Sequence, residues 1–145
     1  MKTTTLIAAM ALLILLALSA TASAGHFDGK KPLLCSIYQL YECDPPNGCV
    51  AVTPAEVQGM SHFDVDFRKK VITRAGVESE QRSPIIATDV IDNKLIIQGM
   101  EDGEADERDG AGWSVTIMDP EGTMTMAVAG DGFGIMGLGA CVPKP

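Results

Sequence analysis

Apolar and polar residues alternate in three segments of the chain, at residues 63–68, 113–118 and 123–128. In each segment every second side chain is apolar, and most of the neighbouring side chains are polar. This period of two predicts antiparallel strands with one face toward a core and one toward solvent. The apolar positions are Phe63, Val65, Phe67, Trp113, Val115, Ile117, Met124, Met126 and Val128.

Four less regular apolar runs fill the gaps, at residues 71–75, 84–91, 94–100 and 133–141. The turn sequences that separate the runs are short, as at Lys69-Lys70, Asp92-Asn93 and residues 119–122. Parallel neighbours would need a crossover of about a dozen residues or more, which these turns cannot supply. We therefore expect neighbouring strands to pair as antiparallel hairpins.

Residues 33–43 fit two interpretations. One is a helical face formed by Leu33, Leu34, Ile37, Tyr38 and Tyr41, and the other is a strand. In a regular strand, a single face would carry Cys35, Ile37, Gln39, Tyr41 and Cys43. We favour the strand because tyrosine and isoleucine prefer strands and a turn sequence follows directly. A single helical turn is a candidate at residues 54–58, with Thr53 as N-cap and Pro54 as its first residue.

The first 24 residues have the layout of a secretory signal peptide. Lys2 precedes an apolar run at residues 6–18, and Ala22-Ser23-Ala24 then offers an A-x-A cleavage site. The run is too short to span roughly 30 Å of hydrocarbon, and no later segment is long and apolar enough to do so. We expect residues 1–24 to be removed and residues 25–145 to form a single β domain, exported to the periplasm or beyond.

Composition narrows the range of partners. Hydrophobic residues make up 46% of the 145-residue chain, which is enough for a packed core. The net charge is −8, and it becomes −9 without Lys2, the only charged residue among the first 24. Such an acidic domain repels nucleic acid and anionic membrane surfaces, so we expect neither as a partner.

Four cysteines lie after the predicted cleavage site, at Cys35, Cys43, Cys49 and Cys141. An even number of cysteines in a small exported domain indicates two disulfides, for which three pairings exist. We favour Cys43–Cys49, because the intervening residues 44–48 form a strong turn sequence, and this leaves Cys35–Cys141. Zinc is disfavoured because the spacings lack the close C-x₂₋₄-C pairs of such sites.

Together these features predict an all-β domain, an antiparallel meander of about eight or nine short strands. Two architectures satisfy this pattern, an up-and-down barrel and a two-sheet sandwich. We favour the barrel, because closing a meander brings its first and last strands together, as a Cys35–Cys141 bond requires.

Catalytic, metal and cofactor motifs are weak throughout, and we expect no enzyme activity, metal or cofactor. Residues 132–137 match G-x-G-x-x-G, but too little chain follows for the helix that the dinucleotide site needs. The acidic run at residues 101–109 does not have the order of a calcium loop, and we expect a solvated hairpin loop there. The pair Met60 and His62 is at most a weak copper site.

Two surfaces are candidates for binding. The barrel interior could hold one small apolar ligand, although in so short a chain the same side chains could simply fill it. The predicted lining is Phe63, Phe67, Trp113, Val115, Met124 and Met126. The Cys43–Cys49 loop, with Asp44, Pro45, Pro46 and Asn47, would be a rigid projection suited to docking on another protein, for example as an inhibitor of an envelope hydrolase. Our leading hypothesis is a structural or protein-binding envelope protein.

The layout resembles uncharacterised small exported proteins of Gram-negative bacteria. The resemblance rests on the signal peptide and on short motifs spread over most of the mature chain. These motifs are Leu34-Cys35, Cys43 with Cys49, Ile96-Ile97-Gln98-Gly99, Gly112-Trp113-Ser114 and Gly139-Ala140-Cys141. It implies an export route and a fold, and it transfers no activity and no site residue.

Overall fold

The computed structural model describes residues 27–57, 59–76, 82–103 and 110–145. These residues form nine strands and no helix. In chain order the strands are β1 (Leu33–Asp44), β2 (Gly48–Val52), β3 (His62–Asp66), β4 (Val71–Arg74), β5 (Arg82–Ile91), β6 (Lys94–Glu101), β7 (Ala111–Met118), β8 (Thr123–Ala129) and β9 (Gly134–Pro143).

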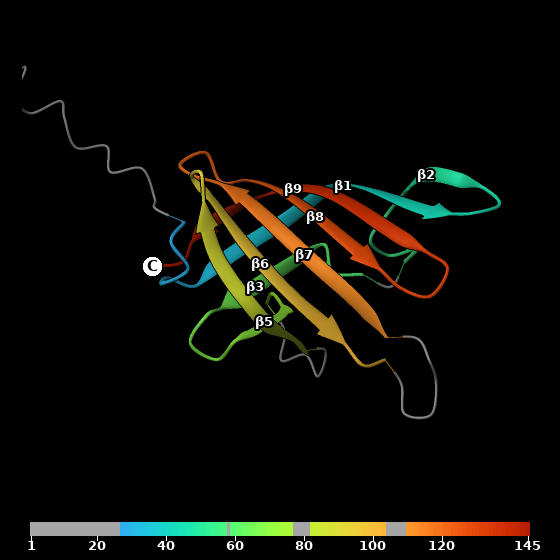
Figure 1. Ribbon diagram of the computed structural model, residues 1–145. Coiled ribbons are helices and arrows are strands. Elements are labelled where there is room, and N and C mark those ends of the chain that lie inside the picture. Colours follow the sequence, from blue (N-terminus) through green and yellow to red (C-terminus); the bar gives the residue numbers. More distant parts are fainter. Residues whose placement is uncertain (1–26, 58, 77–81, 104–109) are drawn as a thin grey trace, which may run out of the picture.

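Eight of the strands close into an antiparallel barrel (Figure 1). From β3 to β9 each strand pairs with the next along the chain, and β9 pairs with β1 to complete the circle. The prediction of an all-β, barrel-like meander is confirmed. One strand departs from the meander: β2 folds back on the outer part of β1. It pairs with residues 40–44 of β1, on the same edge that pairs with β3 at residues 33–36, opposite the edge that pairs with β9.

Both predicted disulfides are present. Cys35 of β1 and Cys141 of β9 stand directly opposite each other, with their Cα atoms 4.0 Å apart. This bond therefore fastens the seam where the first and last strands meet. Cys43 and Cys49 face each other across the β1–β2 hairpin at the same Cα separation.

Two β-bulges bend the barrel wall. In β1 the register with β9 shifts between Ile37 and Gln39, which leaves Tyr38 as the extra residue with 70% of its surface exposed. In β5 the register with β6 shifts between Ile85 and Ala87. An extra residue on one strand bends it and increases its twist, which helps a small sheet to close.

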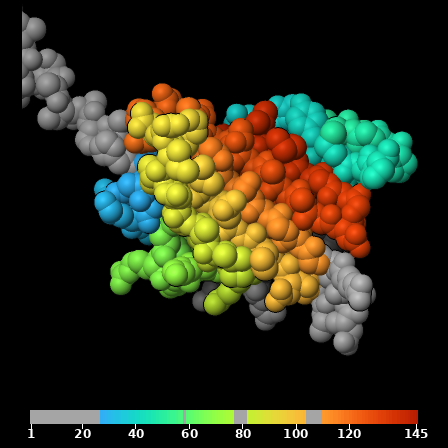
Figure 2. All heavy atoms as spheres, viewed as in Figure 1, coloured from blue at the N-terminus to red at the C-terminus, as the bar shows by residue number. Residues whose placement is uncertain are grey.

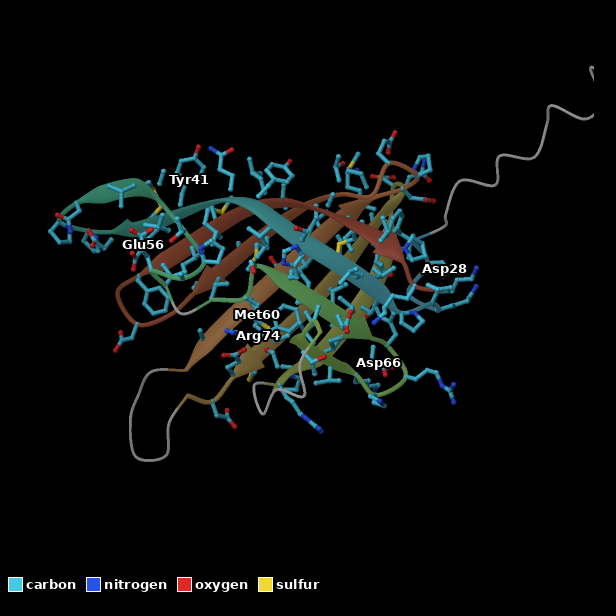
Figure 3. All side chains as sticks on the ribbon, turned by 180° about the vertical axis from the view of Figure 1, so that it is seen from behind. Asp28, Tyr41, Glu56, Met60, Asp66 and Arg74 are labelled. Atoms are coloured by element: carbon cyan, nitrogen blue, oxygen red, sulfur yellow. A yellow bond between two sulfur atoms is a disulfide. The ribbon has the colours of Figure 1, made fainter. Side chains whose placement is uncertain are left out.

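The bulge in β1 corrects one prediction about that strand. Residues Cys35 and Ile37 face the interior as expected, but after Tyr38 the alternation is inverted and Leu40 becomes the buried residue. Tyr41 therefore does not share the face of Cys35, because one additional residue turns every later side chain to the opposite face. Figure 3 shows Tyr41 on the outer side of the hairpin.

Buried side chains fill one end of the barrel. Phe27, before the first strand, packs against Gly122 in the β7–β8 turn, and Gly29 lies against Leu95 and Phe67. The segment at residues 27–31 thus covers this end. The core comprises Phe27, Leu33, Cys35, Phe63, Val65, Ile72, Ile85, Leu95, Ile97, Val115, Ile117, Met124 and Cys141.

The expected helical turn after β2 is a hydrogen-bonded turn at residues 54–57 that does not continue into a helix, and Gln58 lies outside the described residues. The predicted signal peptide and most of the acidic run, residues 104–109, also fall outside them. Within the described part of the chain there is no helix with the length and hydropathy needed to cross a membrane.

Candidate functional site

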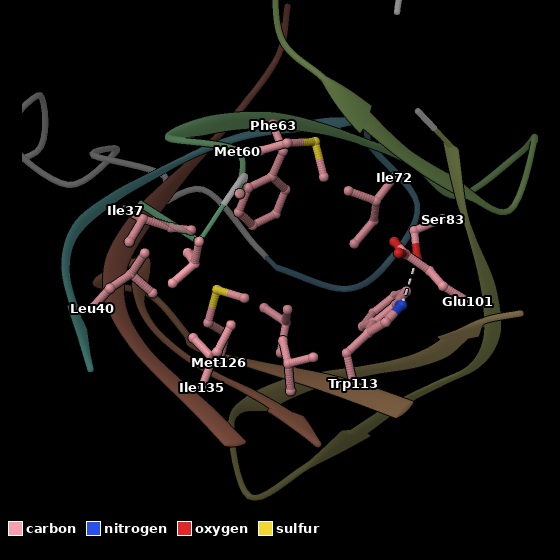
Figure 4. A pocket seen from close by; sticks show the side chains of 14 residues that line it. Ile37, Leu40, Met60, Phe63, Ile72, Ser83, Glu101, Trp113, Met126 and Ile135 are labelled. Atoms are coloured by element: carbon pink, nitrogen blue, oxygen red, sulfur yellow. Dashed lines mark hydrogen bonds between the residues drawn. The ribbon is translucent and has the colours of Figure 1, made fainter. Parts of the chain in front are cut away.

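The other half of the barrel interior holds a cavity of about 160 Å³ (Figure 4). Every strand of the barrel contributes to its wall, and β2 does not. Nearly all of the lining is apolar. The lining residues are Ile37, Leu40, Val57, Gly59, Met60, Phe63, Ile72, Ser83, Glu101, Trp113, Val115, Met126, Val128 and Ile135.

Strand periodicity explains why these side chains converge. Trp113 and Val115 are two residues apart on β7, and their register partners on β8 are Val128 and Met126. Directly opposed residues of an antiparallel pair point to the same face. On β1, the inversion at the bulge is what brings Leu40 into the wall.

Trp113 forms one wall and is held in a defined orientation. It is the register partner of Gly99, where a side chain would overlap both the indole ring and the carbonyl oxygen of Pro84. The ring therefore occupies the space that the absent side chain leaves. Its Nε1–H donates a hydrogen bond to the Ser83 hydroxyl over 2.6 Å, and Ser83 is itself buried. A short bond to a buried partner fixes the indole plane.

The segment between β2 and β3 borders the cavity through Val57, Gly59 and Met60. Reciprocal hydrogen bonds close its turn. The Glu56 carboxylate accepts from the Thr53 backbone N–H and hydroxyl at 2.6 and 2.8 Å, and the Glu56 backbone N–H donates to the Thr53 carbonyl oxygen at 3.1 Å. The two bonds to the carboxylate, the backbone bond first, lower the pKa of Glu56 below its usual value. The carboxylate therefore stabilises the turn in its ionised form, and protonation at acid pH removes that contribution.

One carboxylate belongs to the cavity wall. Glu101, at the end of β6, is exposed to solvent and lines the cavity. Figure 4 shows its side chain among those that line the cavity, and its strand lies between β5, which carries Ser83, and β7, which carries Trp113. The polar groups of an otherwise apolar wall are thus gathered on one side.

Four of the six side chains predicted to line the interior do so, namely Phe63, Trp113, Val115 and Met126. Phe67 lies at the closed end near Gly29. Met124 is part of the filled core, where its sulfur is 3.6 Å from that of Cys141.

Several lining residues were missed by the sequence analysis. Ser83 precedes a proline and Glu101 begins an acidic run, so neither carried a strand signal of its own. Continuing the period of two from Met126 to Val128 would have added Val128 to the set. The residues without a prediction as lining are Ile37, Leu40, Val57, Gly59, Met60, Ile72, Ser83, Glu101, Val128 and Ile135.

The second predicted surface is the tip of the β1–β2 hairpin. Pro45, Pro46 and Asn47 are exposed there, and Asn47 donates from its backbone N–H and its side-chain amide to the Asp44 carboxylate, at 2.7 and 2.8 Å. The hairpin stands clear of the barrel at one end of the molecule (Figure 2). Among the sheet pairings of the described residues, β2 has one neighbour, β1, so its other edge is unpaired.

The glycine motif and the metal-binding motifs lack the surroundings that their functions need in the described part of the chain. The glycines of residues 132–137 lead into β9 and are followed by no helix. No three histidine, cysteine, aspartate or glutamate side chains of the described residues gather as a metal site would require.

A comparison with protein-family models, curated proteins and solved structures finds no match to this chain.

Proposed function

We propose that this protein is a carrier of one small apolar molecule, which it binds inside its barrel without catalysing a reaction. The observation that supports this proposal is the apolar cavity of about 160 Å³ in the open half of the barrel. This choice moves the second hypothesis of the sequence analysis to first place, because the interior is filled only in part.

The size of the cavity sets the size of the ligand. An apolar cavity of about 150 Å³ stays free of water and accommodates a benzene molecule. A single six-membered ring or a short branched chain would therefore fit. Transfer of the ligand's apolar surface from water into the cavity would drive binding.

The proposed setting is the periplasm. The A-x-A signal at residues 22–24 and the two disulfides are compatible with an oxidising, exported location. Intact-mass measurement of the protein isolated from the periplasm tests this part of the proposal, because cleavage after Ala24 fixes the expected mass.

Propylbenzene is a suitable neutral probe of the cavity. We expect it to bind with a dissociation constant on the order of 10–100 µM. Trp113 is the only tryptophan in the chain, so its fluorescence reports occupancy directly. Filling the cavity by Val128→Phe should weaken binding at least about tenfold, since the new ring occupies the ligand's space.

Val142→Phe is the matched control for this prediction. Val142 lies on β9 with 57% of its surface exposed, so the same substitution there adds the ring outside the barrel. Propylbenzene should bind this variant as it binds the wild type. The carrier proposal is wrong if no change in fluorescence or heat accompanies addition of the probe to the folded wild-type protein.

A second candidate function is addition of an extended segment of another protein to β2. The short Cα separation of Cys43 and Cys49 identifies them as a non-hydrogen-bonded pair, and two residues further Ala51 has the same status. The N–H and C=O groups of Ala51 therefore point to the unpaired edge, where a partner strand could bind them.

Ala51→Pro removes this outward N–H and leaves the bonds between β1 and β2 intact, since proline is tolerated on an edge strand. We expect loss of a partner that the wild type captures from an envelope extract, while Ala51→Ser, which keeps the N–H, retains it. Equal capture by all three proteins contradicts binding at this edge.

A further inference from the structure

The cavity has a polar side that an entirely apolar ligand would leave without a partner. The Ser83 hydroxyl, the Trp113 indole and the Glu101 carboxylate line this side from the three neighbouring strands β5, β7 and β6, and the rest of the wall is hydrophobic (Figure 4). Pockets commonly use a few such groups to fix the orientation of a ligand whose body binds through apolar contacts.

The hydrogen-bonding capacity of this side is mostly that of an acceptor. The only side-chain N–H of Trp113 donates to Ser83 and is not available to a ligand. The Ser83 hydroxyl, which accepts that bond, retains its own proton for an acceptor. The Glu101 carboxylate has two acceptor oxygens, and no ion pair with Glu101 occurs among the described residues.

We infer that the ligand carries a positively charged amine, which Glu101 binds at the mouth of the cavity while the apolar body enters the barrel. This inference rests on the proposed carrier function and specifies its ligand class. A bond between an ammonium and a carboxylate is charge-assisted and about twice as strong as a neutral one. The face of the Trp113 ring adds a second attraction for a cation held beside it.

Three probes with the same phenyl body separate this inference from the proposed function. They are 2-phenylethylamine, which is cationic, propylbenzene, which is neutral, and 3-phenylpropanoate, which is anionic. We expect the amine to bind about tenfold more tightly than propylbenzene, by calorimetry and Trp113 fluorescence. The Glu101→Gln variant should lose this tenfold preference and bind propylbenzene as the wild type does.

Asp102→Asn is the matched control, because it removes the same charge from the next residue, which does not line the cavity. This variant should keep the preference for the amine. If Glu101→Gln and Asp102→Asn lose the preference for the amine equally, the amine is attracted by the acidic surface in general, and the inference is overturned.

The remaining outcomes are also decisive. Equal binding of the amine and propylbenzene overturns the amine inference and leaves the carrier function standing. Tightest binding of 3-phenylpropanoate overturns it too, and would direct attention to Arg74, the basic residue opposite Phe63 in the register of β3 and β4. Binding of none of the three probes removes the carrier function itself.

Discussion

Replacing both Cys35 and Cys141 by alanine is expected to lower the free energy of unfolding by about 4–5 kcal/mol. The bond spans 106 residues, and in the chain-entropy model a loop of that length restricts the unfolded chain by about 4.7 kcal/mol. Since small domains are stable by only about 5–15 kcal/mol, this loss is about a third or more of the whole free energy of unfolding. Urea unfolding followed by Trp113 fluorescence measures the loss.

The second disulfide provides the matched comparison. Cys43 and Cys49 are six residues apart, and the same model gives about 2 kcal/mol for so short a loop. Removing this bond should also leave the cavity intact, because the hairpin tip does not line it. If removing either disulfide lowers the free energy of unfolding by the same amount, the length of the closed loop does not determine the stabilisation.

Gly99→Ala is expected to destabilise the barrel by about 3 kcal/mol, the upper range for an overpacked interior. The added Cβ would overlap the Trp113 ring and the Pro84 carbonyl oxygen. The carbonyl belongs to the backbone and cannot move aside at low cost, so the indole must shift. We therefore expect weaker binding of propylbenzene together with an altered emission maximum of Trp113.

Gly112→Ala controls for the general effect of alanine in place of a strand glycine. Gly112 lies on β7 next to Trp113, and a Cβ there meets no atom within 4 Å. The reduced freedom of the unfolded chain should make this variant as stable as the wild type or slightly more so. A similar loss of stability in Gly99→Ala and Gly112→Ala would contradict the role assigned to the contact between Gly99 and Trp113.

The barrel could be predicted because independent sequence features agreed. Strict alternation placed strands around Phe63, Trp113 and Met124, and turns such as Asp92-Asn93 were too short for anything other than hairpins. Both residues of that turn adopt positive φ values of 48° and 58°, as a tight two-residue hairpin requires. The cysteines then favoured a closed sheet over a sandwich, and their pairing is confirmed.

Ten of the fourteen lining residues were missed by the periodic pattern. The bulge at Tyr38 inserts one residue into β1, and no local signal distinguishes Leu40, which faces the cavity, from Tyr41, which faces outward. Register against a strand about a hundred residues away decides which residue is extra.

The polar side of the cavity was hidden for a different reason. Ser83, Glu101 and Trp113 come from three strands, and nothing in the sequence near any one of them indicates the other two. Only the packing of the indole over Gly99 places them together. The sequence pattern predicted Trp113 and three of the apolar lining residues, Phe63, Val115 and Met126, whereas Ser83 and Glu101 required the tertiary structure.

The role of β1 in closing the barrel has a consequence for when the chain can fold. Its inner part pairs with β3 on one side and with β9 on the other, so the barrel cannot close until β9 has been synthesised. Contacts of such long sequence separation form slowly and late. A nascent chain with this topology therefore stays open until its last strand has emerged from the ribosome.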